Sequence, residues 1–165
     1  MAAVTTLPAA FVANTVLTAA EMNALRGAFR ILQVVTGTTS TTVSTTSTSY
    51  VTTNLTASIT PSSTSSKVLL IASLSLRKAT DSVFSEAYLQ AFRGTVAGTA
   101  LTDTQLNLFV EKPVIAQQTM ITLDSPNTAS AQAYTIGVKT ASGLVTIATG
   151  TSGIVGTIML MEVSA

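Results

Sequence analysis

The chain has 165 residues, of which 9% are charged and 47% are hydrophobic, and its formal net charge is +1. It contains no cysteine and no histidine, which excludes disulfides, thiolate chemistry and imidazole ligands or bases. The length fits one domain. Because interface cores are depleted in charge, this composition indicates that copies of the chain or other proteins cover much of its exterior.

The composition also limits the classes of partner. No apolar run approaches the ~20 residues that a membrane-spanning helix needs, so we expect no membrane insertion. A net charge of +1 gives no electrostatic reason to expect nucleic acid as a partner.

Residues 1–36 predict an extended arm that leads into one short α-helix. Thr18 and Glu21 have the spacing of a capping box, and apolar residues then recur at helical spacing, namely Met22, Leu25, Phe29 and Leu32. Two interpretations stay open: the helix packs on its own domain, or it docks into a neighbouring subunit or another protein. The candidate attachment and oligomer contacts here are Phe11, Leu17, Met22, Leu25 and Phe29.

Residues 37–165 predict a domain of short strands. Residues 38–53 are rich in Ser and Thr, which leaves disorder as an alternative, but Val43 and Val51 are spaced like core residues of one or two strands. Residues 54–60 alternate Leu55, Ala57 and Ile59 with polar residues and stop at a proline. This alternation indicates a strand with one buried face.

Residues 67–77 predict the central strand. One face is wholly apolar, and the other mixes Leu69 and Ile71 with Ser73 and Ser75. We expect one face to pack in the core and the other to be partly covered. The residues of the apolar face are Val68, Leu70, Ala72, Leu74 and Leu76.

Further strands are predicted over residues 83–93, 104–110, 113–123, 134–138, 144–149 and 154–163, with a turn at 124–127. Residues 98–103, between Gly98 and Asp103, stay open as a short strand or a loop. The last of them has apolar residues on both faces, which is typical of a buried or interface-facing strand. Met159 and Met161 share one of these faces and are therefore candidate oligomer contacts. The fold class is mainly β: a jelly-roll-like antiparallel β-sandwich, preceded by the arm and the helix.

No constellation of residues predicts catalysis, and we expect no cofactor and no metal site. The seven carboxylates show no spacing that favours an acid–base pair or a calcium loop: Glu21, Asp81, Glu86, Asp103, Glu111, Asp124 and Glu162. Tyr50, Tyr88 and Tyr134 are candidates for sugar or protein recognition, with core or rim packing as the alternative.

Residues 11–23, FVANTVLTAAEMN, resemble the short LTAA-x-[LM]-N opening of many tail and fibre proteins of tailed bacteriophages. The later part resembles the compact β-domains of phage fibre tips and decoration proteins, through residues 59–69, 123–126, 134–138 and 158–163. The resemblance implies a trimeric virion protein, assembled in the host cytoplasm. It would attach through its N-terminal segment to other virion proteins, and it carries over no catalytic residues.

Three roles are compatible with this resemblance. The first is a tail-associated fibre or adaptor that displays a trimeric β-domain to a host-surface glycan or protein. The second is a capsid decoration (cement) protein that stabilises the head shell, because 165 residues leave little room for a fibre shaft. The third is a subunit of a bacterial surface adhesin.

Overall fold

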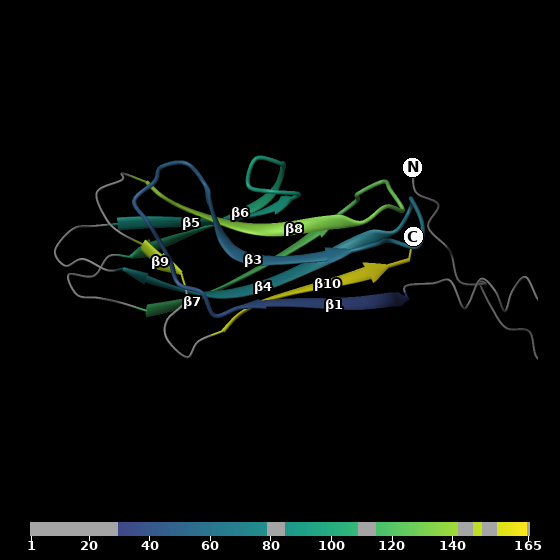
Figure 1. Cartoon of the computed structure of the whole chain (residues 1–165), viewed down its shortest axis with the longest axis horizontal. Helices are drawn as coiled ribbons and strands as arrows, with labels where there is room; N and C mark the ends of the chain where they lie inside the picture. The colour runs from purple at the N-terminus through teal and green to yellow at the C-terminus, as the bar shows by residue number, and fades with distance from the viewer. Residues whose placement is uncertain (1–29, 79–84, 109–114, 142–146, 150–154, 165) are drawn as a thin grey trace, which may run out of the picture.

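The computed structural model describes residues 30–78, 85–108, 115–141, 147–149 and 155–164 (Figure 1). All the regular secondary structure in these residues is β-strand. The strands are β1 (Ile31–Thr39), β2 (Val43–Thr45), β3 (Val51–Ile59), β4 (Lys67–Lys78), β5 (Ser85–Arg93), β6 (Thr99–Leu108), β7 (Ile115–Asp124), β8 (Gln132–Thr140), β9 (Ile147–Thr149) and β10 (Gly156–Val163).

The strands form two antiparallel sheets. In the first, sheet A, β4 pairs with β7 along one side, and with β10 and then β9 along the other. β1 and β2 pair in turn with β10 and β9, so sheet A has four strand positions: β7, β4, β10/β9 and β1/β2. The second, sheet B, has the order β3-β8-β5-β6.

β4 is the centre of sheet A, as the sequence predicts. Its wholly apolar face is buried, and no side chain on that face is more than 2% exposed. On the opposite face Leu69, Ile71 and Ser73 are half-buried. The prediction of one core face and one partly covered face is therefore confirmed.

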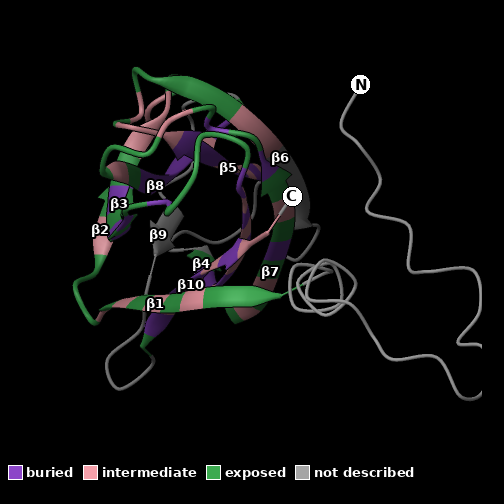
Figure 2. Ribbon diagram, turned by 90° about the vertical axis from the view of Figure 1, so that its right-hand side faces the viewer, coloured by how far each residue is buried: buried purple, intermediate pink, exposed green. Residues whose placement is uncertain are grey.

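The core lies between the sheets and joins both of them into one β-sandwich (Figure 2). Sheet A supplies the apolar face of β4 together with Ile158 and Leu160 of β10. Sheet B supplies alternate residues of β3, β5 and β8, which include Leu55, Leu89 and Ile136. The alternation read from residues 54–60 and 134–138 is thus confirmed, and the Ser/Thr-rich stretch forms strands.

Two predicted limits differ from the structure. β1 begins at Ile31, so it crosses the expected boundary between residues 36 and 37, because residues 31–36 pair with β10. Leu32, the last residue of the helical pattern, lies in this strand; the rest of the predicted helix falls outside the described residues. β6 begins at Thr99, so the stretch left open as a short strand or a loop joins the strand predicted from residue 104, because pairing with β5 overrides the low strand preference of Asp103.

Gly37 of β1 lies where the edges of the two sheets meet. A Cβ atom on Gly37 would clash with the backbone carbonyl oxygen of Thr56 in β3 and would lie 3.0 Å from Cγ2 of Ile158. A backbone oxygen yields less easily than the end of a side chain. Only glycine therefore lets β1 close over this edge of the core.

The Gly37→Ala variant is expected to lose about 1–3 kcal/mol of unfolding free energy, because the added methyl group overpacks a site bounded by backbone. Urea unfolding followed by circular dichroism measures the loss. Thr38→Ala is the matched control on an exposed neighbouring position, with an expected change below about 1 kcal/mol. Equal stability of the two variants would contradict this account of Gly37.

Candidate interaction surface

The outer face of sheet A, which points away from the core, carries two adjacent apolar rows. The strand registers place Val34, Met161, Leu69 and Leu123 in one row across β1, β10, β4 and β7. The same registers place Thr36, Met159, Ile71 and Ile121 in the next row. We call the seven apolar residues of these rows the apolar outer face: Val34, Leu69, Ile71, Ile121, Leu123, Met159 and Met161.

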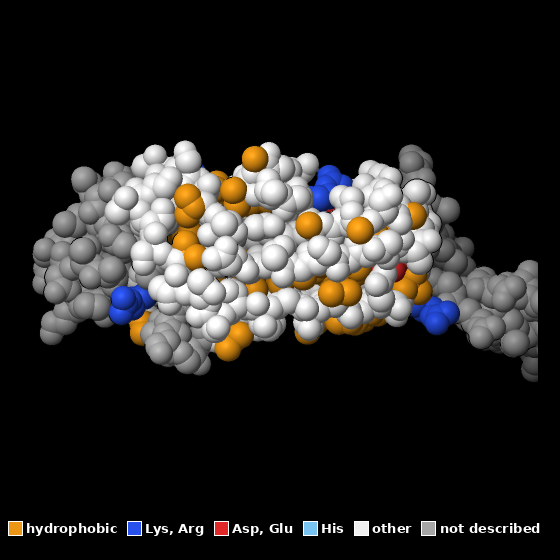
Figure 3. All heavy atoms as spheres, in the orientation of Figure 1, with side chains coloured by type: hydrophobic (Ala, Val, Ile, Leu, Met, Phe, Trp, Pro, Cys, Tyr) orange, Lys and Arg blue, Asp and Glu red, His pale blue; other side chains and the backbone are white. Residues whose placement is uncertain are grey.

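The apolar outer face is open to solvent in the isolated chain. Ile121 is 63% exposed, Leu123 is 54% exposed and Val34 is 52% exposed, while the other four are half-buried by their neighbours in the sheet. No charged residue occupies either row. Figure 3 shows hydrophobic side chains along the lower margin of the sandwich, over β1, whereas Lys and Arg atoms lie near its ends and upper edge. An uncharged apolar patch of this kind is typical of a protein interface.

The next rows of the same face are polar. Thr38, Thr157, Ser73 and Thr119 follow in register, and the hydroxyl groups of Ser73 and Thr119 lie 3.3 Å apart. Nε2 of Gln117 donates to the Ser73 hydroxyl at 2.7 Å. The face is therefore divided into an apolar half and a hydrogen-bonded polar half.

The apolar half lies at the end of sheet A where the preceding residues join β1. Arg30 continues the pairing of β1 beyond the strand: its N–H donates to Oγ of Ser164 at 3.1 Å, and its carbonyl accepts from the Ser164 N–H at 3.0 Å. Arg30 thus lies at the same end of sheet A as the apolar rows.

The structure places two of the seven predicted contact residues. Met159 and Met161 lie on the apolar outer face, in neighbouring rows, while Ile158 and Leu160 of the same strand are buried. The remaining five lie outside the described residues: Phe11, Leu17, Met22, Leu25 and Phe29.

Sequence reasoning missed Val34, Ile121 and Leu123 as surface residues. Val34 falls within the predicted arm and helix, whereas Ile121 and Leu123 fall in a predicted strand, and nothing local in the sequence says which neighbour each one faces. The detectable signal was the pair of apolar residues on the weaker face of the central strand, Leu69 and Ile71.

Glu162 anchors the apolar end of sheet A from the inner side. Its carboxylate is fully buried, and it accepts hydrogen bonds from the backbone N–H of Ser62 at 2.7 Å, the Ser62 hydroxyl at 2.6 Å and Nε2 of Gln33 at 2.6 Å. Burial is the largest single influence and opposes ionisation. The hydrogen bonds from Ser62, Gln33 and Ser66 together outweigh it and lower the pKa of Glu162 to about 2. β10, β1 and the β3–β4 connection are therefore tied to one carboxylate.

This depressed pKa predicts a pH-dependent stability. In the unfolded chain Glu162 has the ordinary value of 4.5, so the carboxylate stabilises the fold fully above pH 4.5 and loses this effect as the pH falls towards 2. At neutral pH, Glu162→Gln is expected to lower the unfolding free energy by roughly 3 kcal/mol. Urea unfolding of both proteins at several pH values between 7 and 2 measures the difference. A gap between the two proteins that does not shrink below pH 4.5 would contradict the assignment.

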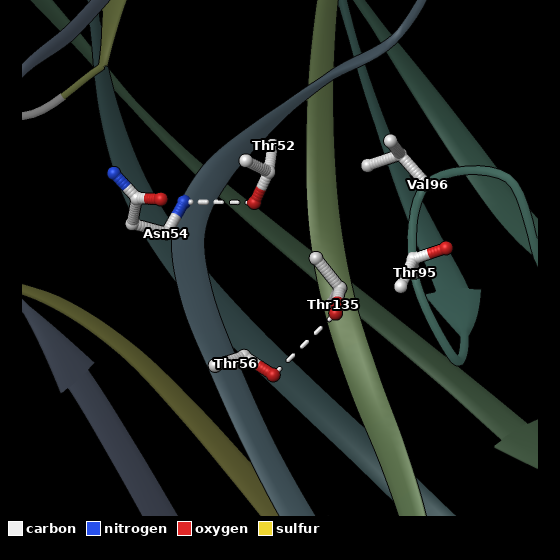
Figure 4. Close-up of a pocket in the computed structure, with 6 residues that line it drawn as sticks. All are labelled: Thr52, Asn54, Thr56, Thr95, Val96 and Thr135. Atoms are coloured by element: carbon white, nitrogen blue, oxygen red, sulfur yellow. Dashed lines mark hydrogen bonds between the residues drawn. The ribbon is translucent and has the colours of Figure 1, made fainter.

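The outer face of sheet B carries a shallow depression with a volume of about 310 Å³ (Figure 4). Its lining is uncharged: four threonines, one asparagine and one valine, namely Thr52, Asn54, Thr56, Thr95, Val96 and Thr135. A register shift in β3 bends the strand here, and Asn54 takes a positive φ of 62°. The hydroxyls of Thr56 and Thr135 lie 3.4 Å apart across the β3–β8 pair.

Two of the three candidate tyrosines lie on this same outer face. Nζ of Lys139 is 4.6 Å from the ring centre of Tyr50 and 5.1 Å from that of Tyr88, and the Tyr88 hydroxyl donates to Glu86 at 2.7 Å. Tyr134 is fully buried, which supports core packing for that residue. Tyr50 and Tyr88 are half-buried, and both rings lie at the surface of sheet B against Lys139.

The described carboxylates do not converge. Glu86 accepts a hydrogen bond from the Tyr88 hydroxyl, and the buried Asp124 accepts one from the Tyr134 hydroxyl. Glu162 accepts its hydrogen bonds from Ser62 and Gln33. Within the described residues, no three His, Cys, Asp or Glu side chains are placed to hold a metal ion. The same part of the chain contains no helix that is long and apolar enough to cross a membrane.

Neither a family model nor a curated protein matches the chain. Among solved structures, it is similar to an arabinose-bound α-L-arabinofuranosidase, with a TM-score of 0.40 and 16% identity over 88% of this chain and 24% of that one. It is also similar to the structure of the Gx strain of infectious bursal disease virus, with a TM-score of 0.40 and 10% identity over 81% of this chain and 40% of that one. The VP2 subviral particle of that virus gives a TM-score of 0.34 and 12% identity, over 80% and 39% of the two chains.

This chain spans less than half the length of each of those proteins. Every one of the TM-scores is below 0.5, so these likenesses carry no argument about what the chain does.

Proposed function

We propose that this chain is a non-enzymatic structural protein of a tailed-bacteriophage virion, a tail-associated fibre or adaptor. In this proposal it forms a homotrimer, attaches to the virion through its N-terminal segment and presents its β-sandwich to the host surface. The observation that carries the proposal is the apolar outer face, which has seven apolar residues, three of them more than half exposed, and no charged residue. Such a face in a chain with only 9% charged residues is best explained by burial in an assembly.

The strand order supports a jelly roll as the finer description of the sandwich. Counting β1/β2 and β9/β10 as single positions gives eight strands, four in each sheet. The first and last positions are neighbours in sheet A, and the second and seventh are neighbours in sheet B. This nested pairing is the arrangement expected of two Greek keys, and jelly rolls are frequent among viral structural domains. The fold alone does not establish the role.

Contacts through sheet A would leave the outer face of sheet B free in the assembly. That face offers hydroxyl and amide groups in the Thr-lined depression, together with the rings of Tyr50 and Tyr88. Neutral hydrogen-bonding groups beside amphipathic rings suit a host-surface glycan or a protein epitope. We therefore place host recognition on sheet B.

Quantitative mass spectrometry of purified particles, with the major capsid protein as the internal standard, tests this role. A fibre or adaptor is expected in tens of copies or fewer, bound to isolated tails. Absence of the chain from purified virions would overturn the proposal.

A capsid decoration protein is the second candidate. The described residues from 30 to 164 form one compact sandwich and include no repetitive shaft, which suits a cement subunit that clamps a shell. In the same measurement, a cement protein would be present in hundreds of copies and would stay with heads after tails are removed.

A further inference from the structure

We propose that residues 18–29 of one copy bind the apolar outer face of a neighbouring copy, so that the subunits are joined by exchanged N-terminal helices. This inference rests on the proposed assembly role and names the occupant of its interface.

The two surfaces have matching chemistry. Residues 18–29 place Met22, Leu25 and Phe29 along one stripe of a helix, whereas Asn23 and Arg26 fall outside it. The two rows that hold the apolar outer face contain no charged residue, and their one hydrogen-bonding side chain is that of Thr36. A helix of this pattern would bury its apolar stripe on the two rows and leave its polar residues in solvent, as helix-in-groove complexes do.

The dimensions also agree. Twelve residues of α-helix are about 18 Å long. Four strand positions that lie about 4.8 Å apart give a face about 14 Å across. The helix is thus long enough to cross β1, β10, β4 and β7, and both apolar rows lie within the width of a single helix.

The pairing at Arg30 indicates that the helix comes from another copy. Arg30 is bonded in both directions to Ser164, so the chain is already extended and aligned with β1 at this residue. If the helix includes Phe29, almost no residues remain for a loop that could fold it back over its own sheet, and connections between a helix and a strand usually take 2–6 residues. The helix would instead continue beyond the end of β1 and reach a neighbour. Repeated around a ring, this head-to-tail contact closes a cyclic oligomer.

A cysteine pair tests the exchange in the full chain, which has no cysteine of its own. The variant carries Met22→Cys in the N-terminal segment and Ile121→Cys on the apolar outer face, and it is treated with a mild oxidant or with a short bismaleimide crosslinker. The proposal predicts covalent dimers and trimers on a denaturing gel. Coexpression of one chain with Met22→Cys and another with Ile121→Cys is expected to give the mixed dimer.

The matched control pairs Met22→Cys with Gln117→Cys, which lies on the same strand and the same face but in its polar half. We expect at least tenfold less crosslinking from this pair. The variants with a single cysteine show how much crosslinking arises between the same residue of two copies.

Two results would contradict the exchange of N-terminal helices between copies. A crosslink within one chain would show that the segment folds back on its own sheet. No crosslink with either reagent, while both thiols react with a monofunctional maleimide, would show that the segment binds elsewhere. If the protein is nevertheless oligomeric and present in virions, the proposed function stands and only the exchange fails.

Discussion

Ile121→Lys is expected to convert the assembled protein into single chains. Ile121 is the most exposed large hydrophobic residue of the described chain and lies within the second apolar row. In an assembly, the lysine would have to bury its ammonium group against Met159 and Ile71, with no carboxylate in either row. The expected cost is several kcal/mol per contact, which corresponds to at least a hundredfold weaker association. Size-exclusion chromatography with light scattering measures the change in mass.

Gln117→Lys is the control with the same charge on the same strand and face, in the polar half. It should leave the mass of the assembly unchanged. Both variants should keep the circular dichroism spectrum of the native chain, because neither side chain points into the core. Equal effects of the two substitutions would mean that the apolar rows have no special role.

Asp124→Ala is expected to cause the largest loss of stability. The Asp124 carboxylate is buried at the end of β7, where it accepts a hydrogen bond of 2.8 Å from the hydroxyl of Tyr134 and lies 3.7 Å from Nη1 of Arg93. Burial, followed by the hydrogen bond to Asp124, raises the pKa of Tyr134 well above its ordinary value of 10.0, so the phenol stays protonated and acts as the donor. Removal of the carboxylate leaves the buried Tyr134 hydroxyl without this acceptor and the partly buried Arg93 guanidinium without its ion pair, although Nη1 of Arg93 still lies 3.4 Å from the carbonyl oxygen of Ser125. The expected cost is about 3–5 kcal/mol.

Urea unfolding measures this loss, and Tyr134→Phe separates its parts. The phenylalanine keeps the packed ring and removes only the hydroxyl, so we expect a smaller loss of about 1–2 kcal/mol. If Asp124→Ala costs no more than Tyr134→Phe, the ion pair with Arg93 contributes nothing, and the account of this cluster is wrong.

The positions of the strands were largely predictable from the sequence because burial follows residue alternation. The apolar positions of residues 67–77 and 54–60 identified the core faces of β4 and β3, and the structure buries them. The start of β6 was not predictable in this way. Asp103 carries a local signal against a strand, and only its pairing with Gln90 of β5 explains its place in the sheet.

The candidate interaction surface was only partly predictable. Met159 and Met161 stood out because both faces of their strand are apolar. The other members of the apolar outer face belong to three different strands, and the register between strands decides whether such residues form a patch or are scattered. A single sequence does not show that Ile121 lies beside Ile71. Glu162 was likewise recognised as a carboxylate, but its donors Gln33 and Ser62 come from distant parts of the chain.

Sedimentation equilibrium of the full chain over a wide range of concentrations tests most directly whether this protein exists as an assembly. We expect a mass of three times the 16.9 kDa of one chain, maintained on dilution and in high salt, because an apolar interface does not depend on charge. A mass of 16.9 kDa at every concentration, in a chain that stays soluble, would contradict the account.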